Sequence, residues 1–541
     1  MTVQALISIP VTLPLLAAGL KLAIGGRQRR LQALISVVTL TTVLAVSLVL
    51  LVAADTGGPL VANAGGWAAP VGITLVADRL SSLMLVVSSA VTLCVMVYSL
   101  AQAYADQEYI APLAIFHPAY LVTVAGVSDA FLSGDLFNLF VAFEMLLSGS
   151  YVLLTFGGTE SRIRAGATYV VIGLASSLLF LVGIAVSYGA TGTVSMAQLA
   201  ERFQVLPGYL KLLVELTLLL VFVVKAAIFP MSAWLPDSYP TAPAPATALF
   251  AGLLTKVGIY SIIRLEALLF PGGPVSVLLM WAALLTMLVG VFGAVAQTDI
   301  KRMLSFTLVS HIGYMVFGVG LSTAAGMAGA VFYVVHHITV QTGLFLVTGL
   351  IERRTGTTSL DRLGGLMRVA PVIAVLFFVP AMNLAGIPPM SGFLGKLTLV
   401  QAGVAVGGPL PLTLVAGGLV TSLLTLYAVA TTWSKAFWRA PPPELAAPAG
   451  TVLESEESPV TRVRREEPSV TRAHGTEGIT GREIVTSVTM PLPMLGSATA
   501  LVALGLSYTV LAGPLSALTR RTADELLARE PYISAVLGSP R

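Results

Sequence analysis

Apolar stretches of about 20 residues follow one another along most of this chain, and short polar or charged segments separate them. A helix rises about 1.5 Å per residue, so about 20 apolar residues are enough to cross the hydrocarbon core of a bilayer. The pattern predicts an all-α polytopic membrane protein with about fourteen transmembrane helices. These helices are expected near residues 3–23, 31–54, 80–102, 111–128, 134–157, 165–188, 209–229, 243–265, 274–297, 303–321, 325–350, 370–398, 410–433 and 489–512.

Two segments fall outside this run of apolar helices. Residues 440–485 are rich in Pro, Glu, Arg, Ser and Thr. Such a composition buries too little apolar surface to fold, so we expect a disordered inner loop here, within a connection over 434–488. The tail 513–541 has apolar residues at helical spacing, and it is expected to lie as an amphipathic helix along the outer membrane interface.

The distribution of lysine and arginine between alternate loops predicts the orientation of the chain. If the N-terminus lies outside, the inner loops hold eighteen of these residues and the outer loops hold eight. Without the 434–488 loop, the inner side still leads by eleven to eight. Because positive residues accumulate on the cytoplasmic side, both termini are expected outside the cell membrane.

An eleven-residue sequence motif that contains proline, here called the proline phrase, occurs twice in the chain. It reads AAIFPMSAWLP at 226–236 and AGIPPMSGFLG at 385–395, with six identical positions. Proline removes a helical hydrogen bond, so Pro230, Pro388 and Pro389 are predicted to be hinges in the seventh and twelfth helices. Paired broken helices in two related halves are typical of transport sites. The duplicated phrase therefore favours a transport unit that is present once in each half.

Four charged residues are predicted to lie deep inside the membrane-spanning helices, although only 10% of the chain is charged: Glu144, Lys225, Lys256 and Lys396. Glu144 is about 15 Å from the start of its predicted helix, which is close to the bilayer midplane. A charge there costs on the order of 2.5–3.5 kcal/mol, and such residues are functional by default. We therefore predict that the four residues form a proton relay. A purely structural ion pair between Glu144 and Lys225 is the alternative.

Histidines and one further glutamate add titratable groups to this set. His336 and His337 are assigned to the relay, and the sequence does not decide which of them lines the path. His311 is a further candidate, and Glu215 is either a proton exit group or an interfacial charge. Adjacent histidines on one helix do not converge on one ion, so no metal site is expected. Lys21 lies near a helix end and is expected to snorkel to the interface.

The sequence features of nucleotide-binding and redox enzymes are missing from the chain. The single cysteine, Cys94, excludes an intramolecular disulfide and a cysteine-held metal cluster. No GxxxxGK[ST] phosphate loop and no GxGxxG turn occurs. We expect no cofactor, no metal and no nucleic-acid partner, and we expect a transporter subunit rather than an enzyme.

Four stretches of the sequence resemble one family of membrane proteins. They are DLFNLFVAFEMLLSGSYVLL, KAAIFPMSAWLPDSYPTAPAPATALFAGLLTKVGIYSIIR, QTDIKRMLSFTLVSHIGYM and AGIPPMSGFLGK. They are similar to the antiporter-like subunits of respiratory complex I and of Mrp-type multisubunit Na⁺/H⁺ antiporters, over about residues 75–435. The part of the second stretch from SYP to KVGIY and the tail LSALTRRTADELL…YISAVLG are most similar to the corresponding sequences of the D subunits of the Mrp type.

The resemblance implies a fourteen-helix fold with two inverted five-helix repeats, in which helices 7 and 12 are broken. The implied parts are helices 1–3 (1–110), a first repeat (111–265), a second repeat (266–433), the loop (434–488) and a last helix with its tail (489–541). By motif position, Glu144 resembles the key glutamate of the family, Lys225 and Lys256 its central lysines, and Lys396 its second-half lysine. A connecting histidine is expected at 336 or 337. The sequence departs from many relatives at Gln341, where a lysine would be expected.

The implied function is proton translocation coupled to Na⁺ efflux, in a bilayer-embedded complex with other membrane subunits. The alternative is a proton-pumping subunit of respiratory complex I or of a membrane-bound hydrogenase. A third interpretation is a scaffold whose buried charges only secure assembly. The sequence separates the first two interpretations weakly.

Overall fold

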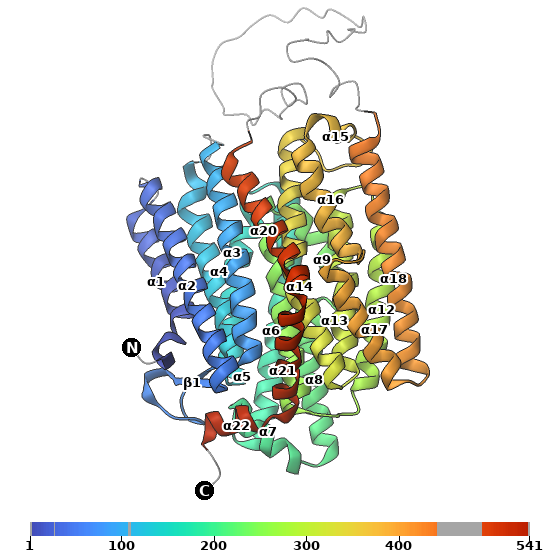
Figure 1. Ribbon diagram of the computed structural model, residues 1–541. Coiled ribbons are helices and arrows are strands. Elements are labelled where there is room, and N and C mark those ends of the chain that lie inside the picture. The colour runs from blue at the N-terminus through green and yellow to red at the C-terminus, as the bar shows by residue number, and fades with distance from the viewer. Residues whose placement is uncertain (1–2, 26–27, 106–109, 441–489, 539–541) are drawn as a thin grey trace, which may run out of the picture.

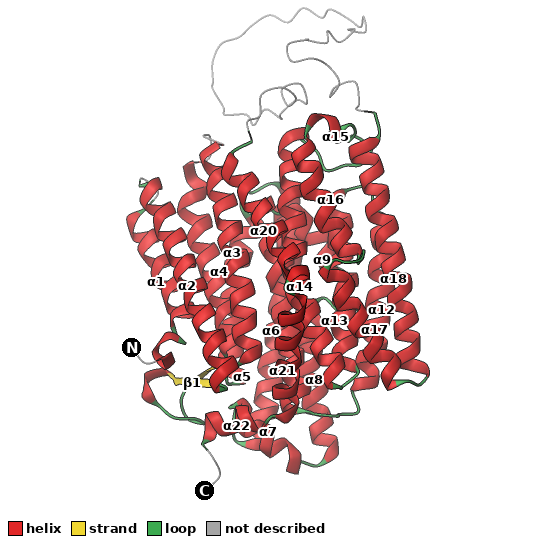
Figure 2. Ribbon diagram, in the orientation of Figure 1, coloured by secondary structure: helices red, strands yellow, loops and turns green. Residues whose placement is uncertain are grey.

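The computed structural model describes residues 3–25, 28–105, 110–440 and 490–538 as one bundle of long, roughly parallel helices (Figure 1). Almost all of the described chain is helical (Figure 2). Within the described residues, twelve helices are long and apolar enough to cross a membrane. The two remaining predicted spans correspond to α8 and to the pair α16 and α17, so the total of fourteen crossings stays a prediction.

The first part of the bundle contains three long helices and a small hairpin. The strands of the hairpin are antiparallel and pair Leu60 with Ala77. This sheet is an addition to the predicted all-helical chain. The elements are η1 (Val3–Leu6), α1 (Ile9–Ile24), α2 (Arg29–Gly57), β1 (Leu60–Asn63), η2 (Ala64–Gly66), β2 (Thr74–Ala77) and α3 (Arg79–Ala105).

The middle of the chain forms two further groups of helices. The first group is α4 (Ile110–Leu132), α5 (Leu136–Thr155), α6 (Glu160–Thr191), α7 (Met196–Arg202), η3 (Phe203–Val205), α8 (Gly208–Ala226), α9 (Trp234–Ser238), η4 (Tyr239–Thr241), α10 (Ala244–Leu249), η5 (Phe250–Leu254), α11 (Thr255–Arg264) and η6 (Leu265–Leu269). The second group is α12 (Ser276–Val295), α13 (Ile300–Gly320), α14 (Ala324–Thr355), α15 (Leu366–Val369), α16 (Pro371–Ala385), α17 (Ser391–Val406), α18 (Pro409–Trp433) and η7 (Ser434–Trp438).

The two copies of the proline phrase interrupt helices, as predicted. The helix α8 ends at Ala226, and helical structure resumes only at α9. The helix α16 ends at Ala385, and α17 begins at Ser391. Each helix is followed by a residue in the left-handed region, Ala227 at φ 56° and Gly386 at φ 88°, which turns the chain out of the helix.

The core of the bundle lies around α14, which Figure 1 shows in the middle of the molecule. The whole apolar window of Ala324–Thr355 is buried, and so is that of the continuous stretch Ala244–Leu269. A helix buried on every side is surrounded by protein rather than by lipid. These two central segments carry Lys256 and both neighbouring histidines, so the structure holds these side chains away from the lipid-facing surface.

A local hydrogen-bond pattern occurs twice, at opposite ends of the bundle. Asp135 accepts from the backbone of Asn138 and forms a bridge with Ser195, and Asp299 repeats both contacts with Arg302 and Ser359. The first copy leads into α7 and the second precedes α15, and Figure 1 places these two helices at opposite ends. The pattern supports inverted repeats, which stay a prediction in their full five-helix extent.

The C-terminal segment differs from its prediction. It contains α20 (Leu492–Val510), α21 (Ala512–Ala528) and α22 (Glu530–Leu537). The helix α21 packs along α14 instead of lying flat at an interface, because one face with Thr519 and Thr522 is buried against the bundle. The predicted disordered loop falls on 441–489, outside the described residues, whereas the beginning of the 434–488 connection continues α18 as η7.

Candidate functional site

The first part of the site joins three helices near the end of α8. The hydroxyl of Ser177 in α6 donates a hydrogen bond to the carboxylate of Glu144 in α5. Lys225 in the last turn of α8 donates to the same Ser177 oxygen at 3.3 Å. Ser177 therefore stands between the glutamate and the lysine. The sequence predicted both charged residues, but it gave no sign of the hydroxyl group that connects them.

A small cavity opens beside this lysine. Its lining includes Phe143, Tyr169, Lys225 and Trp234, and its volume is about 30 Å³. A cavity needs roughly 10–15 Å³ on the same measure to hold one water molecule. The Lys225 ammonium also lies 4.7 Å from the centroid of the Phe143 ring, an arrangement that stabilises a cation in an otherwise apolar setting. Lys225 thus has water-sized space on one side and a protein acceptor on the other.

The second lysine lies just across a close helix contact. A Cβ atom at Gly258 in α11 would be 2.8 Å from the backbone nitrogen of Ala226, so the two helices touch beside Lys225 and Lys256. Lys256 is fully buried and donates to the carbonyl oxygen of Ala251 at 2.5 Å. That carbonyl belongs to η5, a π-helical turn, and such turns are frequent at functional sites. The sequence did not predict this turn.

The next contact joins η5, the turn that precedes α11, to α14. A Cβ atom at Gly252 would be 2.2 Å from the hydroxyl of Thr342 and 3.6 Å from the carbonyl of Ile338. Gly252 follows the carbonyl that binds Lys256, and Ile338 follows His337. The turn η5, whose carbonyl binds Lys256, thus packs directly against α14, which carries His337. The glycine is needed here because any side chain would separate the two helices.

Three histidines and a tyrosine form the centre of the second part. The Tyr333 hydroxyl lies 2.9 Å from Nδ1 of His311, and the rings of His311 and His337 are 5.3 Å apart. The Tyr333 ring is also 5.4 Å from the ring of His336. Both ring nitrogens of His337 lack a protein partner among the described residues. A histidine with two unengaged nitrogens can accept a proton on one side and release it on the other.

Further polar contacts connect His336 with the second helix break. Nδ1 of His336 lies 3.0 Å from the hydroxyl of Ser391, the first residue of α17. Asn383 donates to the same hydroxyl at 3.2 Å. Lys396 donates to the carbonyl oxygens of Leu384 at 3.1 Å and Ala385 at 2.9 Å. The break in α16 leaves these carbonyls without helical partners, so the lysine takes the place of the missing amide donors.

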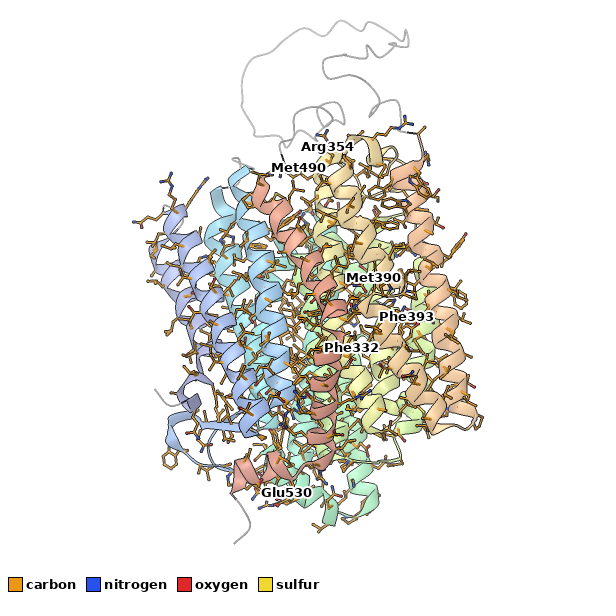
Figure 3. The ribbon with its side chains drawn as sticks, in the orientation of Figure 1. Phe332, Arg354, Met390, Phe393, Met490 and Glu530 are labelled. Carbon is orange, nitrogen blue, oxygen red and sulfur yellow. The ribbon has the colours of Figure 1, made fainter. Side chains whose placement is uncertain are left out.

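The remaining predicted residues have different positions. Pro230, Pro388 and Pro389 lie on the exposed side of the breaks, away from the buried polar groups. Figure 3 shows that the second break, marked by Met390 and Phe393, lies at middle height between Arg354 and Glu530. Glu215 is fully buried in α8 ten residues before Lys225, and no contact with the relay group is present among the described residues. Glu215 therefore does not join the central group.

The prediction for Lys21 is wrong. Its side chain does not extend to the interface but is fully buried, and its ammonium donates to Ser36 in α2. Gln32 in the same helix donates to the carbonyl oxygen of Lys21 at 2.9 Å. The position of Lys21 near a helix end suggested snorkelling, whereas its hydroxyl partner on the next helix decides the orientation of its side chain.

The described residues contain no group of three or more His, Cys, Asp or Glu side chains that could bind a metal ion.

Sequence comparisons place the chain next to membrane transport proteins. The family described as NADH:quinone oxidoreductase/Mrp antiporter, TM matches residues 133–425. A relative from Alkalihalophilus pseudofirmus, named as the D subunit of a Na(+)/H(+) antiporter, is 41% identical over 438 residues, which cover 80% of this chain and 87% of the relative. The protein of the same name from Bacillus subtilis is 37% identical over 434 residues, which cover 80% and 86%.

Solved structures give the same result. A chain of the Mrp complex from Dietzia sp. DQ12-45-1b has a TM-score of 0.85 and 32% identity, with 99% of this chain and 100% of that chain covered. A chain of respiratory complex I from Thermus thermophilus has a TM-score of 0.75 and 23% identity, with 96% and 99% covered. At that identity the second likeness concerns the fold alone.

Proposed function

The chain belongs to the NADH:quinone oxidoreductase/Mrp antiporter transmembrane family, and we propose that it works as a proton-translocating subunit of a multisubunit Na⁺/H⁺ antiporter. Its curated relatives are named antiporter D subunits, and the similar Dietzia chain is part of an Mrp complex. Other membrane subunits are therefore its partners, and it is a transporter subunit rather than a catalytic enzyme. The complex I alternative is supported by the shared family and by the fold, whereas the named relatives with more than 30% identity are antiporter subunits.

The observation that carries the proposal is a series of mostly buried polar groups that extends through both halves. It begins at Glu144, Ser177 and Lys225, crosses to Lys256, and continues through the histidines to Lys396. Buried charges cost free energy in a bilayer, so seven titratable groups along this series favour a transport role over a structural one. Proton transfer suits them, because each group can gain and lose a proton.

In the proposed mechanism, the Ser177 hydroxyl passes a proton between Glu144 and Lys225. The hydroxyl accepts a proton from the ammonium and gives its own proton to the carboxylate. Lys256 then exchanges with Lys225, and His337 receives the proton on α14. The chain through His311, Tyr333 and His336 reaches Ser391, next to Lys396. Pro230, Pro388 and Pro389 serve as hinges that let the two breaks change shape.

We place the chain in the cell membrane with both termini outside. The end of the bundle with α15 then faces the cytoplasm, because it carries Arg353, Arg354, Arg362 and Arg368. The opposite end, with α7 and α22, faces outward. The five parts 1–110, 111–265, 266–433, 434–488 and 489–541 are proposed with the boundaries that the sequence predicts, and the two middle parts are the repeated transport units.

The test uses the complete complex in everted membrane vesicles. A pH-sensitive dye reports the collapse of a preformed proton gradient when Na⁺, K⁺ or Li⁺ is added. We expect Glu144→Ala and Lys225→Ala to abolish the Na⁺-dependent signal. Copurification of the other subunits measures assembly in the same membranes, and it should be unchanged. Loss of assembly together with loss of activity would instead establish the scaffold interpretation.

A further inference from the structure

Two buried carboxylates lie outside the relay, on two neighbouring helices. Glu215 in α8 is 0% exposed, and Glu266 in η6, directly after α11, is 7% exposed. Each glutamate is ten residues away from a relay lysine in the sequence, which corresponds to about 15 Å along a helix. Glu215 lies ten residues before Lys225, and Glu266 lies ten residues after Lys256. Both carboxylates therefore lie toward the α7 end of the bundle, at the same distance from the two lysines.

Neither carboxylate is satisfied by the surrounding protein. Both oxygens of Glu215 and Oε1 of Glu266 have no hydrogen-bond partner in the described structure. The helix α8, which carries Glu215, packs against η6, which carries Glu266, and this packing places the two carboxylates in one neighbourhood. A buried carboxylate without a partner is costly, and two of them together can share a proton because both cannot ionise cheaply.

Two of the three cations near the glutamates bind other groups. Arg264, two residues before Glu266, binds Asp78 at 2.5 Å. Arg529, which follows α21, donates to the carbonyl oxygens of Leu268 and Ala200. Lys211 lies one turn before Glu215 on α8, but no ion pair between them is present in the described chain. Neither glutamate therefore has an ion-pair partner among the described residues.

A glycine makes room for one of the carboxylates. A Cβ atom at Gly273 would be 2.5 Å from Oε1 of Glu215 and 3.2 Å from Oε2. The backbone conformation of this glycine does not itself require glycine, since its φ is not in the left-handed region. Its missing side chain therefore allows the carboxylate to lie against the loop between η6 and α12.

We propose that Glu215 and Glu266 form a proton-holding pair at the α7 end of the translocation path. This inference rests on the proposed function and adds a site to it. With one shared proton the pair has a charge of −1. A second proton, released by an ammonium of the relay, neutralises the pair, and one proton then leaves to the water at that end.

The experiment compares four variants of the complete complex in everted vesicles. Glu215→Gln and Glu266→Gln keep the size of each side chain but remove its titration. The double variant removes both, and Gly273→Ala displaces the Glu215 carboxylate while both acids remain. The matched control is Glu201→Gln, which changes an exposed glutamate of α7 at the same end.

We expect each single glutamine variant to slow Na⁺-driven proton transfer about tenfold or more, since a positioned proton-transfer group contributes about that much or more. The double variant should be little slower than either single variant, because the two residues act as a unit. Gly273→Ala should also be slow, and the control should match the unmodified protein. Infrared difference spectra should show a protonated carboxyl band that is absent in Glu266→Gln.

Each contrary result has a defined meaning. If Lys225→Ala is inactive while all four pair variants transport normally, the pair is not on the path and the proposed function stands. If Lys225→Ala transports normally, the proposed function itself fails. Additive losses in the double variant would show that the two glutamates act separately. A changed Na⁺ half-saturation with normal proton transfer would make the pair a Na⁺ site, and this would overturn the proton assignment.

Discussion

Replacement of Ser177 by alanine tests the central step of the proposed relay. The hydroxyl of Ser177 is the only described atom that bonds to both Glu144 and Lys225. Alanine removes this oxygen and changes little else, because Ser177 is 5% exposed and alanine fits the same space. The two charged groups keep their positions on α5 and α8 but lose the group between them.

The structure gives the expected size of the effect. A hydrogen bond to a charged group contributes about 1.5–3 kcal/mol, and about 1.4 kcal/mol corresponds to a factor of ten. Loss of the bond to Glu144 should therefore slow proton exchange with Lys225 by roughly tenfold to a hundredfold. The assembled complex should be affected less, since one buried hydroxyl among many helix contacts contributes little to the free energy of unfolding.

The assay measures Na⁺-dependent collapse of a proton gradient in everted vesicles, with copurified subunits as the measure of assembly. Ser187→Ala is the matched control, because Ser187 is buried in the same helix but bonds only to the carbonyl of Gly183 in its own helix. Ser177→Thr retains a hydroxyl and should recover part of the activity.

One result would refute the reasoning. If Ser177→Ala transports as fast as the Ser187→Ala control, the hydroxyl does not lie on the path, and proton exchange between Glu144 and Lys225 follows another route. If Ser177→Ala loses assembly as well as transport, the residue has a structural role. Only slow transport in an intact complex, with recovery in Ser177→Thr, agrees with a bridging hydroxyl.

Three further predictions concern stability, measured as the thermal unfolding temperature of the purified complex. Gly392→Ala should clearly lower the unfolding temperature, because the new Cβ would be 2.0 Å from the carbonyl oxygen of Asn383. The control is Gly189→Ala, whose new Cβ meets no atom within 4 Å. Equal unfolding temperatures of the two variants would contradict the packing at Gly392. Asp299→Ala should cost about 0.5–2 kcal/mol through loss of the α13 cap, and an unchanged temperature would show that the cap is unimportant. Arg79→Ala should lower the unfolding temperature more than Arg521→Ala, because Arg79 is less exposed and binds both Asp55 and Glu525. An exposed ion pair, such as that of Arg521, contributes only about 0–1 kcal/mol. A larger effect of Arg521→Ala would exclude this account.

The charged residues of the site could be predicted from the sequence because the bilayer makes them conspicuous. Glu144, Lys225, Lys256 and Lys396 interrupt long apolar stretches, and each lies in the buried part of the bundle or beside it. The two helix breaks could be predicted for the same reason, since proline removes a backbone donor in a region without water. Their roles in proton transfer stay a prediction.

The uncharged members of the site could not be predicted. Ser177, Tyr333 and Asn383 are residue types that occur throughout membrane helices, where most hydroxyls bond to their own backbone. Only the packing of α6 against α5 and α8 gives Ser177 its two partners. The same limit explains the error at Lys21, because Ser36 becomes its partner only when α1 packs against α2.

The two halves use the same broken helix in different ways. In the first half, Lys225 lies before the break and meets an acid through a hydroxyl, and the freed backbone groups bind other residues, such as Trp234 on the carbonyl of Val224. In the second half, Lys396 lies after the break and binds the freed carbonyls itself. A lysine held by a carboxylate can lose its proton to that partner, whereas carbonyl oxygens accept hydrogen bonds but take no proton. Lys225 is therefore suited to exchange protons within its own half, and Lys396 must exchange them with the histidine group or with water. In the proposed relay, the connection between the halves is therefore assigned to α14, which carries His336 and His337.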